Sequence, residues 1–249
     1  MNVLSIGNSF SQNAHLLLPR MIKADGDSDF MLCNLFIPGC SLEEHWKNMK
    51  SEEEKYQYQV YLPGETKMTT ADEIALYEPL EDEEWDFVTI QQASGLSGIS
   101  ESWSPYAEEI TAFIRMCAPK AKVLIHETWA YDGSTKHPDF AKYSSSTGTM
   151  FDCISEAVAV AEINTDIDGV IPSGLAFQIA RQTSFKKSLT AEDGFHASVF
   201  GSYLAGACFY EKITGRSILD NRYLIEDCLK EYTDLLALCA HTAVERYGK

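Results

Sequence analysis

Basic residues are scarce in this sequence. It holds 20 lysines and arginines against 37 aspartates and glutamates, which gives a formal net charge of -17 at pH 7. A field of that sign repels phosphate backbones and anionic lipid surfaces. We therefore expect neither a nucleic-acid partner nor a membrane-surface partner, and the charge says nothing about the oligomeric state.

Long apolar runs are also lacking. No stretch approaches the roughly 20 apolar residues that cross a bilayer, and residues 2–6 lead into the chain without a basic stretch or an apolar signal core. We therefore predict a cytoplasmic protein, although a signal peptide that has been removed would leave no trace in this sequence.

The seven cysteines include no C-x-x-C pair. An odd number at these spacings favours reduced thiols in the core over a disulfide framework or a zinc site. Repeats, low-complexity segments and Ser/Gly/Pro linkers are absent as well. We therefore expect residues 1–249 to form a single domain, with no metal ion and no organic cofactor.

Four motifs of common enzyme classes are missing: G-x-x-x-x-G-K-[ST], G-x-G-x-x-G, H-E-x-x-H and G-x-S-x-G. The sequence therefore does not support assignment to four classes: P-loop nucleotide hydrolases, dinucleotide-binding enzymes, zincin metalloproteases and ordinary α/β-hydrolases.

What the sequence does contain is an alternation of short apolar runs with longer helical patterns, which is typical of βα units around a parallel sheet. Five parallel strands are expected at residues 3–6, 30–37, 87–91, 123–126 and 169–171. Helices are expected at residues 14–24, 42–50, 105–117, 145–163, 175–182, 197–214 and 224–247. Residues 56–70 alternate polar and apolar side chains around a Pro-Gly turn, which predicts an inserted hairpin in this α/β fold.

A candidate nucleophile lies where the first expected strand ends. Residues 7–11 (GNSFS) place Ser9 at the carboxyl edge of the sheet, where open parallel sheets form ligand crevices. A serine hydroxyl becomes a good nucleophile only when a histidine removes its proton and a carboxylate orients that histidine. Asp193 and His196 offer both groups on one loop. A helix-capping or turn role is the alternative for Ser9 alone, and the joint placement favours catalysis.

These motifs resemble those of the SGNH (GDSL-like) hydrolase superfamily. Residues 7–11 resemble its first block, residues 193–196 (DGFH) resemble its last block, and Gly39 matches the glycine of its second block. Residues 91–94 (QQAS), 127–131 (ETWAY) and 193–197 (DGFHA) are similar to a bacterial branch of it that is catalogued only as a domain of unknown function.

The resemblance implies a flavodoxin-like α/β/α sandwich of three layers. It further implies that Ser9 attacks an ester carbonyl, that His196 takes the serine proton and passes it to the leaving alcohol, and that Asp193 orients His196. The implied oxyanion hole consists of the backbone N–H groups of Ser9 and Gly39 and an asparagine side chain from the third block.

The sequence departs from the family pattern at that third block, because residues 91–94 read QQAS where the family has Gly-x-Asn-Asp. By strand alternation Gln91 shares a face with Ala93, the position of the missing asparagine. We therefore predict that Gln91 is the third oxyanion-hole donor. Gln92 in that role, or two glutamines that only bond loop backbone, are the alternatives.

Trp129 and Tyr131 follow the fourth expected strand at the same edge. Trp129 is a candidate substrate-binding residue because an aromatic ring there could floor an acyl or sugar pocket, and the alternative is a ring that plugs a loop onto the core. The remaining histidines are expected to be structural; they are His15, His45, His126, His137 and His241.

Together these observations predict a serine esterase that removes a short acyl group, often acetyl in this superfamily, from a small or carbohydrate-linked alcohol through an acyl-enzyme. Two alternatives remain open. An acyltransferase would pass the acyl group from the same triad to another alcohol, and a carbohydrate-binding protein would keep the fold without turnover.

Overall fold

The computed structural model describes residues 1–226 and 228–248. Within these ranges one sheet holds seven strands in the order β4-β3-β2-β1-β5-β6-β7. The strands are β1 (Asn2–Gly7), β2 (Met31–Phe36), β3 (Tyr56–Tyr61), β4 (Thr69–Ile74), β5 (Phe87–Ile90), β6 (Lys122–His126) and β7 (Gly169–Ile171). The five strands expected from the apolar runs are β1, β2, β5, β6 and β7, and they pair in parallel.

The expected count of five strands for the sheet is wrong, because residues 56–74 add two more. Strand β3 pairs antiparallel with β2, and β4 pairs antiparallel with β3. The stretch expected as an inserted hairpin thus continues the sheet and covers the backbone groups along the outer edge of β2. Strand β4 becomes the new edge, and its residues are mostly exposed.

The expected helix at residues 14–24 is two helices, α1 (Ser9–His15) and α2 (Leu18–Ala24). Pro19 lies in the first turn of α2, where a backbone N–H would have no partner within the helix, so its absence loses no hydrogen bond. A proline in the interior of a helix would lose such a bond, so α1 does not continue through Pro19. The start of α1 at Ser9 places this residue two positions after the last residue of β1.

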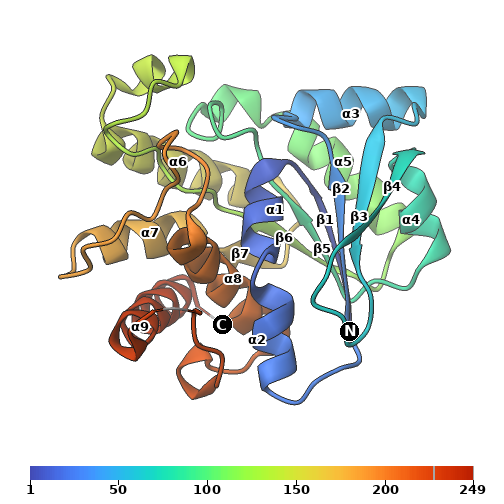
Figure 1. Ribbon diagram of the computed structural model, residues 1–249. Coiled ribbons are helices and arrows are strands. Elements are labelled where there is room, and N and C mark those ends of the chain that lie inside the picture. Colours follow the sequence, from blue (N-terminus) through green and yellow to red (C-terminus); the bar gives the residue numbers. More distant parts are fainter. Residues whose placement is uncertain (227, 249) are drawn as a thin grey trace.

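Helices cover both faces of the sheet (Figure 1). The others are α3 (Leu42–Ser51), α4 (Tyr77–Asp82), α5 (Tyr106–Cys117), α6 (Thr147–Asn164), α7 (Ser173–Arg181), α8 (Val199–Thr214) and α9 (Lys230–Tyr247). Helices α1 and α2 pack on α8, which packs on α9, whereas α3 and α4 pack on α5. The helix expected at residues 224–247 begins only at Lys230, and position 227 within it lies outside the described residues.

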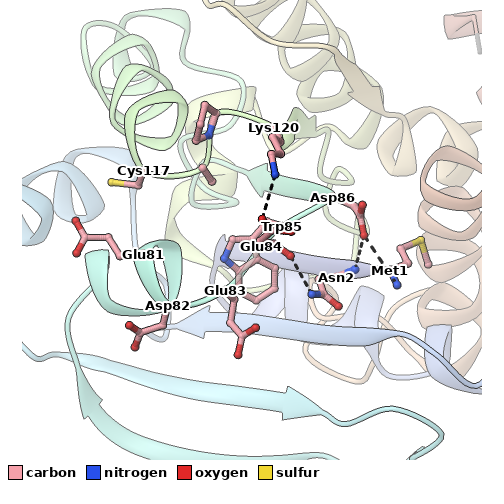
Figure 2. A pocket seen from close by; sticks show the side chains of 12 residues that line it. Met1, Asn2, Glu81, Asp82, Glu83, Glu84, Trp85, Asp86, Cys117 and Lys120 are labelled. Atoms are coloured by element: carbon pink, nitrogen blue, oxygen red, sulfur yellow. Dashed lines mark hydrogen bonds and ion pairs between the residues drawn. The ribbon is translucent and has the colours of Figure 1, made fainter.

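The two edges of the parallel sheet differ in character. At the amino edge, a hollow of about 480 Å³ is lined by Met1, Asn2 and the acidic residues that precede β5 (Figure 2). Ser9, Gly39, Gln91 and His126 all lie at the carboxyl edge, at or just after the ends of parallel strands, so the candidate site lies at the other end of the sheet. In the described part of the chain, no helix has the length and apolar character to cross a membrane.

Candidate active site

Ser9 is the first residue of α1 and follows β1 after a tight turn. The Asn8 side chain caps the helix, because its Oδ1 accepts the Phe10 N–H at 3.0 Å. The Ser11 hydroxyl accepts the Asn8 N–H at 3.1 Å. A Cβ on Gly7 would lie 2.2 Å from the Ser11 Oγ, so only glycine fits this turn. The Ser9 side chain is consequently held, partly exposed, at the carboxyl edge.

His196 lies between Ser9 and Asp193. Its Nε2 is 2.9 Å from the Ser9 Oγ, and its Nδ1 is 2.7 Å from the Asp193 Oδ2. The other carboxylate oxygen, Oδ1 of Asp193, accepts the backbone N–H groups of Phe195 and His196 at 3.0 Å each. The structure therefore brings the serine, the histidine and the aspartate singled out from the sequence into one hydrogen-bonded row.

The electrostatics of Asp193 suit this arrangement. Partial burial raises the pKa of the Asp193 carboxyl. The hydrogen bonds from the Phe195 N–H and from the ring and N–H of His196 lower this pKa by more than burial raises it, so the net pKa lies below its ordinary value. An ionised Asp193 accepts the Nδ1–H of His196. The Nε2 of the neutral ring is then free to accept the Ser9 hydroxyl proton.

The loop that carries His196 is fastened to the core by Trp129. The Trp129 ring is 0% exposed and is stacked between Phe10 and Phe177, at centroid distances of 4.3 and 4.6 Å. Its Nε1–H donates to the Phe195 carbonyl at 2.8 Å. Of the two roles considered for Trp129, this burial favours the plug over the pocket floor, because a substrate would reach the ring only if the ring left the core.

A second contact fastens the same loop near Asp193. The Thr135 hydroxyl donates to the Asp193 carbonyl, and the Asp132 N–H donates to the Gly194 carbonyl, at 2.7 Å in both cases. Gly194 has a φ of +75°, and a Cβ there would lie 2.9 Å from Thr135. This close approach explains why a glycine stands between the aspartate and the histidine.

An aromatic row extends from the His196 ring. The Phe195 ring lies 4.2 Å from the His196 ring, and the His137 ring lies 4.9 Å from Phe195, measured between centroids. The Tyr131 ring lies 4.9 Å from His137. Phe195 and His137 are partly exposed, whereas Tyr131 is fully buried. The row thus presents a partly apolar surface beside the His196 ring.

Gly39 lies in a turn after β2 that the Cys40 N–H closes by donating to the Ile37 carbonyl at 3.2 Å. Its φ of +64° is in the left-handed region that favours glycine. The Asn8 Nδ2 donates to the Cys40 carbonyl at 3.0 Å. The turn that carries Gly39 is therefore joined to the turn that carries Ser9.

Gln91 is 1% exposed and lies directly after β5. Its Nε2 donates to the Asn8 Oδ1 at 2.8 Å, and its Oε1 is 2.7 Å from the His126 Nδ1. Gln92 bonds backbone groups, since its Oε1 accepts the Leu42 N–H at 2.9 Å and its Nε2 donates to the Ser102 carbonyl at 2.7 Å. The structure thus places Gln91, and not Gln92, against the side chain of Asn8, which caps the helix that begins at Ser9.

Sequence reasoning gave no role to Asn8 or Ser173 and treated His126 only as structural. The His126 Nε2 is 3.0 Å from the Ser173 Oγ, so these residues continue the contacts of Gln91. The signal that could have found them is their position, because each residue lies at or just after the carboxyl end of a parallel strand.

Comparison with solved structures shows the fold of SGNH hydrolases. A candidate SGNH hydrolase from Slackia heliotrinireducens has a TM-score of 0.61 and 21% identity, over 85% of this chain and 97% of that chain. Axe2, an acetylxylan esterase from Geobacillus stearothermophilus, has a TM-score of 0.53 and 14% identity, over 86% of this chain and 94% of that chain.

A DUF4886 family protein from Bacteroides uniformis ATCC 8492 is much more similar. Its crystal structure gives a TM-score of 0.95 at 32% identity and covers 100% of this chain and 96% of that chain. A search of curated protein sequences finds no match. The model of the family described as "Domain of unknown function (DUF4886)" matches residues 2–243, and the chain therefore belongs to this family.

Proposed function

We propose that the protein is a serine esterase that removes a short acyl group, acetyl in the simplest case, from a small or carbohydrate-linked alcohol. The observation that carries this proposal is the row of hydrogen bonds from the Ser9 Oγ to the His196 Nε2, 2.9 Å, and from the His196 Nδ1 to the Asp193 Oδ2, 2.7 Å. Nucleophile, base and orienting carboxylate at these distances are the requirement for acyl transfer through serine.

In the proposed reaction the Ser9 Oγ attacks the ester carbonyl carbon while the His196 Nε2 takes the hydroxyl proton. The tetrahedral intermediate collapses when His196 passes that proton to the leaving alcohol, which leaves an acyl group on Ser9. A water molecule, deprotonated by His196, then attacks the acyl-enzyme and releases the carboxylic acid. Asp193 stays ionised throughout and stabilises the imidazolium.

The oxyanion of the intermediate would meet the backbone N–H groups of Ser9 and Gly39. The joined turns of these two residues support this part of the proposal, since the Asn8 side chain bonds the Cys40 carbonyl at 3.0 Å. A third donor at Gln91 would have to use the amide hydrogen that does not face Asn8. The contacts of Gln91 with Asn8 and His126 therefore favour a supporting role for it.

The partly apolar surface beside the His196 ring supports the proposed substrate class. The rings of Phe195 and His137 can pack against an acyl group or the apolar face of a sugar. The net charge of -17 disfavours anionic substrates. The fold shared with an acetylxylan esterase is compatible with an acetylated carbohydrate.

The test is hydrolysis of p-nitrophenyl acetate by the protein and by its Ser9→Ala and His196→Ala variants, with folding matched by circular dichroism. We expect each variant to lose at least about 10⁴-fold in kcat. Ser28 is an exposed serine between α2 and β2. Ser28→Ala is therefore the matched control and should retain full activity. Equal activity in all four proteins would exclude Ser9 as the nucleophile.

A fluorophosphonate probe gives a second readout that does not depend on the acyl group. The probe should add to the protein and to Ser28→Ala, but not to Ser9→Ala, as seen by intact mass. Labelling with no hydrolysis of simple esters would direct the search to acetylated sugars and to alcohol acceptors, because transfer to an added alcohol would reveal an acyltransferase.

A further inference from the structure

One continuous chain of hydrogen bonds crosses the carboxyl edge of the parallel sheet. It runs from Ser173 through His126, Gln91 and Asn8 to the backbone carbonyl of Cys40, and we call these five residues the cross-strand chain. The successive distances are 3.0, 2.7, 2.8 and 3.0 Å. None of the five residues is more than 3% exposed. Each residue lies at the end of a different parallel strand or shortly after it, so the chain spans β7, β6, β5, β1 and β2.

The direction of this chain is fixed by backbone groups that cannot exchange roles. The Cys40 carbonyl only accepts and the Phe10 N–H only donates, so Asn8 must turn its Nδ2 to Cys40 and its Oδ1 to Phe10. That oxygen also faces Gln91, which must therefore present its N–H to Asn8 and its Oε1 to His126. The His126 nitrogen next to this oxygen, Nδ1, must carry a hydrogen.

The other nitrogen of His126 then has an acceptor role. It faces the Ser173 hydroxyl, which can donate to it. The ring packs edge-on against Phe209 at a centroid distance of 4.9 Å and lies 6.2 Å from Trp129. Burial, with a smaller contribution from His15, lowers the pKa of His126 to about 3. His126 is thus a neutral ring in a single tautomer.

The chain ends beside the two N–H groups proposed for the oxyanion hole. Asn8 directly precedes Ser9, and Cys40 directly follows Gly39. The distance between these two N–H groups therefore depends on the side chain of Asn8, which Gln91 holds from behind. A misplacement of about 1 Å in such a site can cost about 100-fold in rate.

We propose that Gln91 and His126 are positioning residues, which fix Asn8 and thereby set the separation of the Ser9 and Gly39 N–H groups. This inference rests on the proposed function for its effect on rate, but its effect on the two turns exists whether or not the protein is an esterase. Gln91, which stands in the block where the family has its asparagine, therefore acts on Ser9 through the side chain of Asn8.

The first test changes Gln91. Gln91→Met removes both of its polar groups, and we expect kcat for p-nitrophenyl acetate to fall by about 100-fold with little change in KM. Thr89→Val is the matched control: Thr89 lies on β5, the strand that Gln91 directly follows, is equally buried and bonds the Ser5 hydroxyl at 2.7 Å, outside the cross-strand chain. Its kcat should stay close to that of the unmodified protein. Equal kcat losses in the two variants would overturn the proposal.

Gln91→Glu adds a pH readout that a purely structural role would not move. An ionised carboxylate cannot donate to Asn8, whereas a protonated one can donate to Asn8 and still accept from His126. The activity of this variant relative to the unmodified protein should rise as the pH falls from 8 to 5. The same ratio for Gln91→Met should be flat, and a flat ratio for Gln91→Glu would count against the proposal.

His126 is tested by rescue. A glutamine at position 126 keeps one N–H donor and one acceptor, while a leucine keeps neither. We expect His126→Gln to be at least about tenfold more active than His126→Leu, since about 1.4 kcal/mol of transition-state stabilisation corresponds to tenfold. Equal activity of the two variants would overturn the role of His126.

The closing experiment does not need turnover. Hydrogen–deuterium exchange should quicken in peptides that cover residues 7–11 and 37–41 in Gln91→Met, but not in Thr89→Val. If the unmodified protein hydrolyses no ester and exchange still quickens, the proposed function fails and the positioning inference stands. If Ser9 proves catalytic while both kcat and exchange are unchanged in Gln91→Met, the inference fails alone. Should Gln91→Met not fold, the pH series of Gln91→Glu decides.

Discussion

The indole N–H of Trp129 donates a 2.8 Å hydrogen bond to the backbone carbonyl of Phe195. Phe195 directly precedes His196, and its own ring lies 4.2 Å from the imidazole. The fully buried Trp129 ring thereby connects the core of the sheet to the loop that carries the proposed base. A residue that does not touch the solvent can in this way control the position of one that does.

Trp129→Phe tests this control. The phenyl ring retains the stack with Phe10 and Phe177 but loses the hydrogen bond, so we expect a stability loss of about 1 kcal/mol. We also expect kcat to fall by about tenfold, since His196 is less well aligned. Kinetics with p-nitrophenyl acetate and urea unfolding measure the two effects.

Trp85→Phe is the matched control for that variant. Trp85 is also buried and donates to the Pro79 carbonyl at 2.7 Å, but it lies at the amino edge of the sheet (Figure 2). It should show a similar loss of stability with an unchanged kcat. If Trp129→Phe behaves in the same way, the link between the indole and the base has no bearing on activity.

Asp193→Asn should reduce kcat by about 10⁴-fold with only a small change in stability. The amide oxygen can still accept the N–H groups of Phe195 and His196, so the loop keeps its shape. The amide nitrogen, however, can donate to the His196 Nδ1, which moves the ring hydrogen to Nε2 and prevents that atom from accepting the serine proton. Steady-state kinetics and thermal denaturation test this together. Retention of more than about a tenth of the activity would show that Asp193 does not set the tautomer.

Much of the fold could be predicted because the central strands are buried on both faces and read as continuous apolar runs. The extent of the sheet could not. The alternating pattern at residues 56–70 predicts a hairpin, but which edge a hairpin joins depends on the backbone groups that β2 leaves open, and no local pattern encodes these. Pro19 is the sequence signal for the split of the first helix, because proline is favoured in the first turn of a helix and disfavoured in its interior, and Pro19 lies in the first turn of α2.

The candidate site shows a similar limit. Ser9, Asp193 and His196 could be singled out because loops at the carboxyl ends of parallel strands share one edge. Alternation gave the face of Gln91 but not its partner, since the partner His126 is 35 residues away and becomes a neighbour only through the pairing of β5 with β6. The role of Trp129 depended on the burial of one ring, which the sequence pattern leaves open.

At Gly201 in α8, we expect alanine to destabilise the helix, contrary to the usual helix propensities. Alanine normally stabilises a helix by about 1 kcal/mol over glycine, but a Cβ at position 201 would lie 2.1 Å from the Leu189 carbonyl oxygen. That carbonyl also accepts the Ser198 N–H at 3.0 Å and lies at the base of the loop that carries Asp193. We expect Gly201→Ala to lower the free energy of unfolding by about 2 kcal/mol and to reduce kcat.

Gly148→Ala is the control for this variant, because a Cβ at position 148 in α6 would meet no atom within 4 Å. It should leave kcat unchanged and the free energy of unfolding equal or slightly higher, as measured by urea titration. Equal stabilities of the two variants would mean that the contact between Gly201 and Leu189 yields without cost.

Glu127 makes the stability of the protein depend on pH. Its carboxyl is fully buried, and burial raises its pKa to about 7 although the Leu175 N–H and the Tyr247 hydroxyl donate to it at 2.9 and 2.8 Å. The folded state thus binds this proton more tightly than the unfolded chain does. The resulting stabilisation is complete below the ordinary pKa of 4.5 and is lost as the pH rises through about 7.

Glu127→Gln removes that dependence, because an amide does not titrate in this range. The free energy of unfolding of the unmodified protein, minus that of the variant, should fall by about 2 kcal/mol between pH 5 and pH 8. Urea unfolding of both proteins at each pH measures this difference, and the subtraction cancels the other carboxylates. Parallel curves for the two proteins would show that Glu127 titrates alike in the folded and unfolded states. Tyr247→Phe should extend the dependence to higher pH, since the loss of the hydroxyl donor raises the pKa of Glu127 further.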